Sequence, residues 1–232
     1  MTLDGWYATF DFDEREKDFV MDCALFVDQN AKFVYDFFGI ESNRREKPTI
    51  HIIPTKDEFD RIYKKICNKE ASYNVPSWVI GFASGDIYYL SINDYKNTSH
   101  AFSPDKKKEA VCYYKKTLVH EFVHFVHEQF NKEHGCCNRS KWLSEGVAVY
   151  LSGQHGVLNN DNDFNYAKEE AFGQQGNHYM AYGLLFRYLT ENYPKAFVFS
   201  LFESAQNASE SFKEELYGKA KKYYNSVAKE KK

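Results

Sequence analysis

Residues 117–130 read TLVHEFVHFVHEQF and place three histidines among valine, leucine and phenylalanine. Apolar residues at helical spacing predict an amphipathic helix over residues 107–131. Residues four positions apart lie on one helix face, so His120 and His124 can direct ring nitrogens to the same point. Glu121 then lies about 100° around the helix, beside that point. This pattern restricts the fold. If the two histidines bind an ion, a different element has to supply the remaining ligands.

The residues His120, Glu121 and His124 form the order H-E-x-x-H. Zinc binds imidazole and carboxylate ligands, and catalytic zinc sites use three protein ligands and leave one position open. The motif therefore predicts a zinc site in which the glutamate acts as general base. The alternative interpretation is that the histidines are ordinary core residues of an apolar helix face.

A third ligand has to come from outside this helix. His127 follows His120 by seven residues, but three turns of one straight helix cannot surround one ion, so we interpret His127 as helix surface or as a neighbour of the site. A second helix over residues 140–152, antiparallel to the first, would bring Glu145 to the same ion. The downstream candidates are His127, His134, Glu145, His155 and His178.

The combination of HEFVH with the later WLSEGVAVY resembles the gluzincin metallopeptidases of the peptidase MA-like group, and more distantly the M1 aminopeptidases. In that family the third ligand is a glutamate in a W-L-x-E-G-x-A pattern. The metzincin continuation, with glycine and a third histidine after the helix, does not fit FVHEQF. The resemblance implies one Zn²⁺ ion bound by His120, His124 and Glu145, with Glu121 as general base. The residues that match the pattern are Trp142, Leu143, Glu145, Gly146, Ala148 and Tyr150.

Two further segments are similar to parts of that family. NHYMAYGLLFRYL resembles the helix start that carries an oxyanion-stabilising tyrosine, which implies this role for Tyr179, with Tyr182 or His178 as alternatives. VPSWVIGFASGDIYYL resembles the edge strand that lines the substrate cleft. This likeness implies that Gly81, Phe82 and Ala83 bind the substrate backbone. The competing interpretations are a packing role for Tyr179 and an ordinary hairpin.

The pattern along the chain predicts an α+β protein with a zincin-like fold. We expect a single domain with a helix-plus-sheet lobe over about residues 1–105 and a helical lobe with the zinc site over about residues 106–232. Strands are predicted at TIHIIP and as a pair within residues 75–92, separated by an Ala-Ser-Gly-Asp turn. Helices are predicted over residues 14–38, 57–67, 107–131, 140–152, 165–172, 178–192, 196–205 and 210–227.

The composition limits the classes of partner. The net charge is −3 with both signs spread along 232 residues, so there is no basic excess to neutralise nucleic-acid phosphates. No apolar run approaches the roughly 18 residues of a membrane span. The N-terminus lacks the pattern of a secretory signal, and the five cysteines show no disulfide-framework spacing. We therefore expect a cytoplasmic protein with reduced thiols that binds neither membrane nor nucleic acid.

The expected function is zinc-dependent hydrolysis of a peptide or protein substrate. An endopeptidase is favoured over an exopeptidase because IGFASGD lacks the G-x-M-x-N signature with which M1 aminopeptidases recognise a free amine. Two alternatives remain open at this stage. One is a zinc-binding regulatory protein with an idle or structural site, in which His127, Cys136 or Cys137 would supply a fourth ligand. The other is a hydrolase of a non-peptide amide or ester.

Overall fold

The computed structural model describes residues 1–41, 47–95, 98, 107–136, 140–154, 178–204, 207 and 209–230. The chain forms two compact units, Met1–Val126 and His127–Lys232. The boundary between them falls within one helix, α3 (Lys107–His134). Within the described residues, no helix combines the length and the apolar character needed to cross a membrane.

The first unit contains a five-stranded mixed sheet with the order β1-β2-β3-β5-β4. The central strands β2, β3 and β5 run parallel, whereas β1 and β4 are antiparallel to their neighbours. A mixed sheet combined with separate helices confirms the α+β class. The strands are β1 (Thr2–Asp4), β2 (Thr9–Asp11), β3 (Thr49–Ile53), β4 (Gly81–Ser84) and β5 (Asp86–Leu90).

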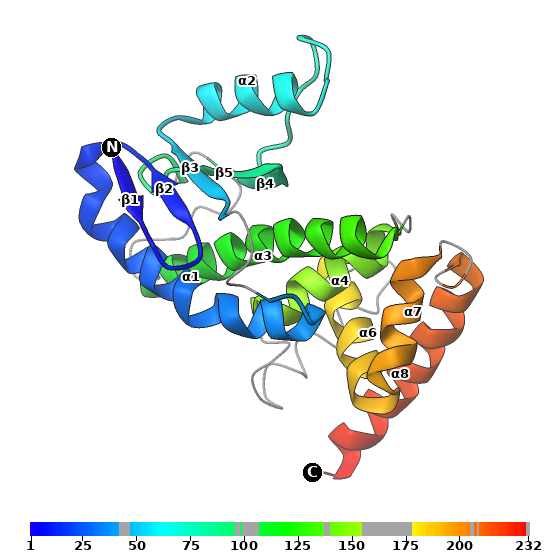
Figure 1. Cartoon of the computed structure of the whole chain (residues 1–232). Helices are drawn as coiled ribbons and strands as arrows, with labels where there is room; N and C mark the ends of the chain where they lie inside the picture. The colour runs from blue at the N-terminus through cyan, green and yellow to red at the C-terminus, as the bar shows by residue number, and fades with distance from the viewer. Residues whose placement is uncertain are drawn as a thin grey trace. The chain divides into compact units, whose positions relative to one another are not determined.

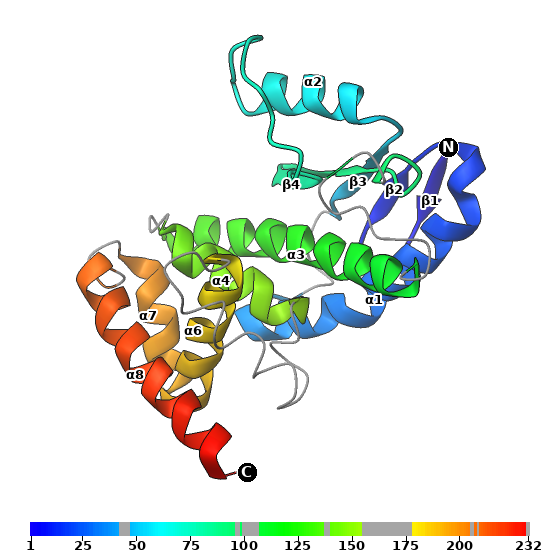
Figure 2. The same cartoon turned by 180° about the vertical axis from the view of Figure 1, so that it is seen from behind.

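Helices cover both faces of this sheet. Figures 1 and 2 show α2 (Lys56–Ile66) on one side of the sheet and α1 (Lys17–Phe38) with α3 on the other. The alternation of side chains along a strand explains the two layers. On the α2 side, Phe82 packs edge-on against Phe59 with ring centroids 5.7 Å apart. On the α3 side, the rings of Tyr89 and Tyr114 are perpendicular, with centroids 4.8 Å apart.

Helix α1 packs through the apolar face that the sequence pattern predicted, with Val20, Cys23, Val27 and Val34 buried. It ends at Gly39, whose φ of 70° is the left-handed conformation of a helix C-cap.

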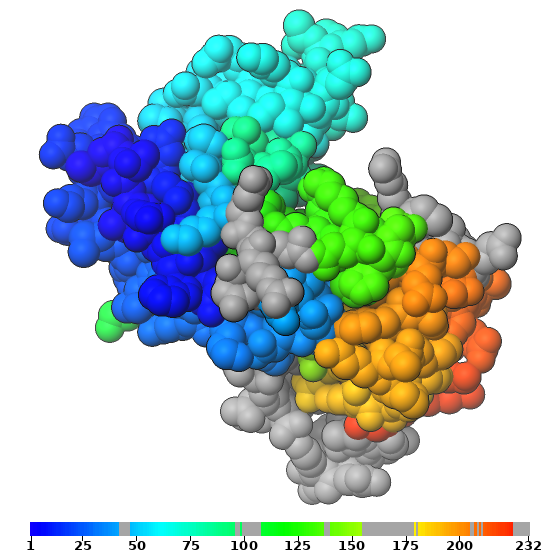
Figure 3. Space-filling model, viewed as in Figure 1, coloured from blue at the N-terminus to red at the C-terminus, as the bar shows by residue number. Residues whose placement is uncertain are grey.

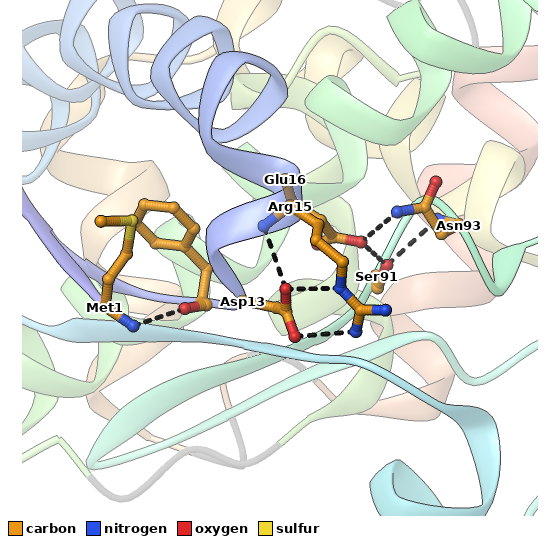
Figure 4. Close-up of polar contacts among 7 residues, drawn as sticks. Met1, Asp13, Arg15, Glu16, Ser91 and Asn93 are labelled. Carbon is orange, nitrogen blue, oxygen red and sulfur yellow. Dashed lines mark hydrogen bonds and ion pairs between the residues drawn. The ribbon is translucent and has the colours of Figure 1, made fainter.

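The start of α1 is fixed to the sheet by the buried carboxylate of Glu16. Figure 4 shows the Glu16 side chain accepting hydrogen bonds from the Ser91 hydroxyl and, at 2.6 Å, from the Asn93 amide. Its charge is therefore compensated by donors that follow β5.

The outer face of α2 and the segment after it lie at the surface of this unit, as the cyan atoms in Figure 3 show. A shallow hollow of about 480 Å³ is present there. Its lining carries charges of both signs, so it favours no ligand of a single charge. The lining residues are Asp57, Asp60, Arg61, Lys64, Lys69 and Ala71.

The second unit is helical throughout its described residues. It contains the end of α3, α4 (Lys141–Leu151), α6 (His178–Asn192), α7 (Lys195–Glu203) and α8 (Glu210–Glu230). Helices α4 and α6 are in extensive contact, and Figure 2 shows them close together. The Tyr224 hydroxyl of α8 donates a hydrogen bond to the Leu184 carbonyl of α6 at 3.2 Å. The core is lined by Trp142, Leu143, Val147, Leu184, Phe186, Leu189, Val198, Phe202, Leu216 and Ala220.

Most predicted elements are confirmed to within a few residues. The predicted helix over residues 14–38 begins as a short 3₁₀ turn, Glu14–Glu16, and continues as α1. The paired strands and their turn are confirmed as β4 and β5, with Gly85 at a φ of 71°. The predicted helix over residues 165–172 lies outside the described residues. Strands β1 and β2 were not predicted, because each has three residues and too short an alternation to recognise.

Candidate metal centre

His120 and His124 lie on successive turns of α3 in the first unit. Their Nε2 atoms are 3.1 Å apart, and the two rings are nearly perpendicular at 81°. Two nitrogen ligands of one tetrahedral zinc ion lie about 3.3 Å apart, given Zn–N bonds of about 2.05 Å. His120 is 6% exposed and His124 is half-buried. The ring nitrogens therefore have the spacing of two ligands of one ion.

Glu145 supplies the third potential ligand. It lies in the second turn of α4, and one ligand atom from each of His120, His124 and Glu145 lies within 4.8 Å of the other two. Within the described part of the chain, this group has three members, and neither His127 nor Cys136 belongs to it. Three donors with two imidazoles and one carboxylate fit a zinc ion with one open coordination position. Cys137 lies outside the described residues.

Glu121 is half-buried and lies against strand β4 rather than among the three potential ligands. The position that a Cβ atom would take on Gly81 is 3.0 Å from Glu121 Cγ. The same position is 2.4 Å from the ring of Tyr89, the residue directly opposite Gly81 on β5. The motif glutamate therefore lies next to the start of β4, where the absence of a side chain permits close contact.

Tyr89, next to the contact between Gly81 and Glu121, is fixed by burial and by hydrogen bonds. Its ring is fully buried, and its hydroxyl donates a hydrogen bond to Thr117 Oγ1, one turn before Glu121 on α3. The Thr117 hydroxyl in turn donates to the Tyr113 carbonyl at 2.9 Å. Burial is the main cause that raises the pKa of Tyr89 well above its usual value, and the charge of Glu121 adds to it. Tyr89 therefore stays a neutral hydrogen-bond donor.

Strand β4 lies at one end of the described sheet. The Leu90 amide donates to the Ile80 carbonyl at 2.8 Å, so Ile80 and Leu90 form a hydrogen-bonded pair. Such pairs alternate along an antiparallel ladder. Phe82 is therefore hydrogen-bonded to β5, whereas the backbone groups of Gly81 and Ala83 point away from β5, towards the outer edge of the described sheet.

The two tyrosine candidates lie on α6 in the second unit. The Lys141 ammonium, at the start of α4, is 5.6 Å from the ring centroid of Tyr179. Lys141 precedes Glu145 by one helical turn, so Tyr179 packs near the face of α4 that carries the potential ligand. The Tyr182 carbonyl would be 2.8 Å from a Cβ atom on Gly146, which places Tyr182 at the closest approach of α4 and α6.

The other histidines are not members of the potential metal group in the described residues. His127 is 4% exposed and packs against Phe202 with ring centroids 4.7 Å apart, so the interpretation as helix surface was wrong. The His127 side chain was expected to face solvent, but α7 packs over this part of α3. His134 stacks on Phe130 at 4.3 Å. His155 and the side chain of His178 lie outside the described residues.

Two contacts of the site were not predicted from the sequence. The packing of Gly81 against Glu121 depends on strand register, and the only signal was a glycine within a strand pattern. The position of Lys141 over Tyr179 carried no signal, because the two residues lie on different helices.

Comparisons of the chain with family models, curated proteins and solved structures gave no match. The resemblance to gluzincins therefore rests on the two short sequence motifs alone.

Proposed function

We propose that the chain is a zinc-dependent peptidase of the gluzincin type with a zincin-like fold. The observation that carries this proposal is the grouping of His120, His124 and Glu145, with ligand atoms within 4.8 Å of one another. The location of Glu121 beside an open strand edge supports it, since a structural zinc site has no use for that carboxylate. Among the described residues the group has three members, which favours an open coordination position over a closed structural site.

In this proposal each residue has one task. A zinc ion held by His120, His124 and Glu145 would polarise the substrate carbonyl and lower the pKa of a water molecule towards neutrality. Glu121 accepts the proton from that water and passes it to the leaving amine. Tyr179 donates a hydrogen bond to the oxyanion that develops on the substrate carbonyl.

The substrate is proposed to be an extended peptide or protein segment. Its backbone pairs with the outward-facing groups of Gly81 and Ala83, which adds a strand to the sheet at β4. Strand addition recognises backbone rather than a terminal amine. Together with the missing G-x-M-x-N signature, this mode of binding favours an endopeptidase.

Metal content is the first test. Purified protein loaded with zinc and dialysed is expected to retain one ion per chain, measured by mass spectrometry of the metal. Replacing His120, His124 or Glu145 by alanine is expected to reduce this content strongly. The matched control is His134→Ala, which removes a histidine from the same helix outside the group and should leave the zinc content at one.

Catalysis is tested with Glu121→Gln in a digest of a broad peptide library. We expect this variant to keep its zinc and to lose cleavage by about 100-fold or more, because general-base catalysis contributes on the order of 10²–10⁴-fold. Glu128→Gln changes an exposed glutamate of the same helix, paired with Lys132 at 2.8 Å, and should keep full activity.

The outcomes separate the three functions. Stoichiometric zinc with no cleavage of any peptide would indicate a binding or regulatory protein. Cleavage of ester or non-peptide amide substrates alone would indicate a different hydrolase. Full peptidase activity in Glu121→Gln would refute the mechanism.

A further inference from the structure

We propose that Gly81 is a positioning residue for Glu121, in addition to any backbone contact that it makes with a substrate. In this proposal, the missing side chain at position 81 lets the aliphatic part of Glu121 pack directly on β4, which fixes the direction of its carboxylate. The inference rests on the proposed peptidase function, because it gives Glu121 the role of general base.

The first argument is steric. Gly81 and Tyr89 are directly opposite each other in the antiparallel pair, and side chains at both positions face α3. The Tyr89 ring leans over Gly81 and fills the space that a side chain there would need, at 2.4 and 2.5 Å from the position of a Cβ atom. Glu121 Cγ closes the remaining side at 3.0 Å. Any side chain at position 81 has to displace one of these two groups or the strand itself.

The second argument is that Tyr89 cannot give way. Its ring is fully buried, lies perpendicular to Tyr114 at 4.8 Å, and is tied through its hydroxyl to Thr117. Thr117 and Glu121 are one turn apart on the same face of α3. Two consecutive turns of the helix therefore contact the two adjacent strands β5 and β4. A side chain added at position 81 would therefore have to displace Glu121 or strand β4.

The third argument concerns why residue 81 is a glycine. Gly81 does not adopt a positive φ, whereas Gly85 in the following turn has a φ of 71°. A Cβ atom on Gly85 would meet no atom within 4 Å. Glycine is therefore needed at position 81 because of space and at position 85 because of backbone conformation. The two residues form a matched pair in one hairpin, and a Cβ atom would lie against Glu121 at position 81 but meet no atom within 4 Å at position 85.

The contact itself can be tested without any enzyme assay. In the NMR spectrum of the full chain, a strong nuclear Overhauser effect is expected between the Gly81 Hα protons and the Glu121 Hγ protons. The assignment is checked with Glu121→Asp, which has no γ-methylene group. Absence of this signal in the zinc-loaded wild-type protein would overturn the inference.

The positioning role is tested with Gly81→Ala and Gly85→Ala. We expect Gly81→Ala to retain zinc and to lose about 10- to 100-fold in kcat, since displacement of a reacting group by about 1 Å can cost on the order of 100-fold. Gly85→Ala should lower the unfolding midpoint and keep the wild-type kcat, because it strains the turn without contacting Glu121.

Each remaining outcome has a defined meaning. An increase in KM with unchanged kcat in Gly81→Ala would assign Gly81 to substrate binding alone and overturn the positioning role. Equal losses of kcat in both variants would overturn it too, because the effect would then follow stability. If zinc-loaded wild-type protein cleaves no peptide, the peptidase proposal fails, and the Gly81–Glu121 nuclear Overhauser effect alone decides whether Gly81 orients this glutamate.

Discussion

Tyr179, at the start of α6, has a cation over its ring. The Lys141 ammonium is 5.6 Å from the ring centroid, and such a contact contributes roughly 0.5–1 kcal/mol at a partly exposed site. It restricts the ring to one side of α4, one turn before Glu145. For Tyr182, the backbone carbonyl is the group that approaches Gly146 of α4.

We predict that Tyr179→Phe lowers kcat about 10- to 100-fold with little change in zinc content, because loss of one oxyanion donor typically costs on the order of 10²-fold. Tyr182→Phe, the matched control on the same helix, should change kcat less than about threefold, because Tyr179 rather than Tyr182 is assigned the oxyanion contact. Steady-state kinetics on one cleaved peptide provide the measurement. A larger loss in Tyr182→Phe would transfer the role to that residue.

At the scale of single residues, the contacts that depend on helical spacing were predicted from the sequence. Contacts between elements that are distant in the sequence were not. His120 and His124 were predicted as neighbours because four residues make about one turn of a helix. Glu145 followed from the resemblance of WLSEGVAVY to a family pattern. The contact between Gly81 and Glu121 was not predicted, because it requires the strand register and the packing of α3 on the sheet.

The helix pair α4 and α6 shows how one small residue sets the distance between two elements. A Cβ atom on Gly146 would lie 2.8 Å from the Tyr182 carbonyl and 3.3 Å from Phe186 Cβ. Backbone atoms cannot rotate away as a side chain can. Gly146 therefore allows the close approach of α4 and α6, and it follows Glu145 directly in the chain.

We predict that Gly146→Ala destabilises the protein by about 1–2 kcal/mol, because overpacking costs roughly 1–3 kcal/mol and the better helix propensity of alanine returns less than 1 kcal/mol. Gly218→Ala is the matched control in α8, where a Cβ atom meets nothing within 4 Å. This control should stabilise by up to about 1 kcal/mol. Urea unfolding in the presence of a chelator measures both values without a metal contribution.

If Gly146→Ala stabilised the protein as much as Gly218→Ala, the contact between α4 and α6 would have room for a methyl group, and the prediction would be contradicted.

Among the elements, the long helices were predicted because many turns repeat the same apolar spacing. Strands β1 and β2 were not, since three residues each give almost no alternation. Their place in the sheet depends on pairing with β3, a contact that is distant in sequence.

At the scale of the whole molecule, stability depends on groups that must stay uncharged in the core. Burial raises the pKa of the Cys23 thiol to about 12, while an unfolded cysteine ionises near about 8.5. Between these values the unfolded chain releases a proton that the folded chain keeps. Folding stability therefore falls as pH rises through this range.

We predict that the free energy of unfolding of the wild-type protein falls with pH more steeply than that of Cys23→Ala above about pH 9, by up to about 1.4 kcal/mol per pH unit. The comparison removes the contributions of other titrating groups, which both proteins share. Cys112→Ala, at an exposed position, should follow the wild-type slope. Urea unfolding under reducing conditions gives the values, and parallel curves for wild type and Cys23→Ala would contradict the prediction.

The α+β class was predictable because the expected strands all precede residue 93, and the segments expected after them are helical. Two lobes were also expected, but the boundary between the two units could not be placed from the sequence, because it falls within α3. A continuous helical pattern gives no sign of where side-chain contacts change from one core to another.

The position of β4 at the edge of the described sheet also has a consequence for the behaviour of the protein at high concentration. Backbone groups that can pair with one extended peptide can pair with any unfolded chain, including a copy of the same protein, and such edges promote aggregation. Strand β4 has only four residues, of which Gly81 and Ala83 have outward-facing backbone groups. An adventitious strand therefore gains few hydrogen bonds, so the shortness of β4 limits amyloid-like growth from this edge.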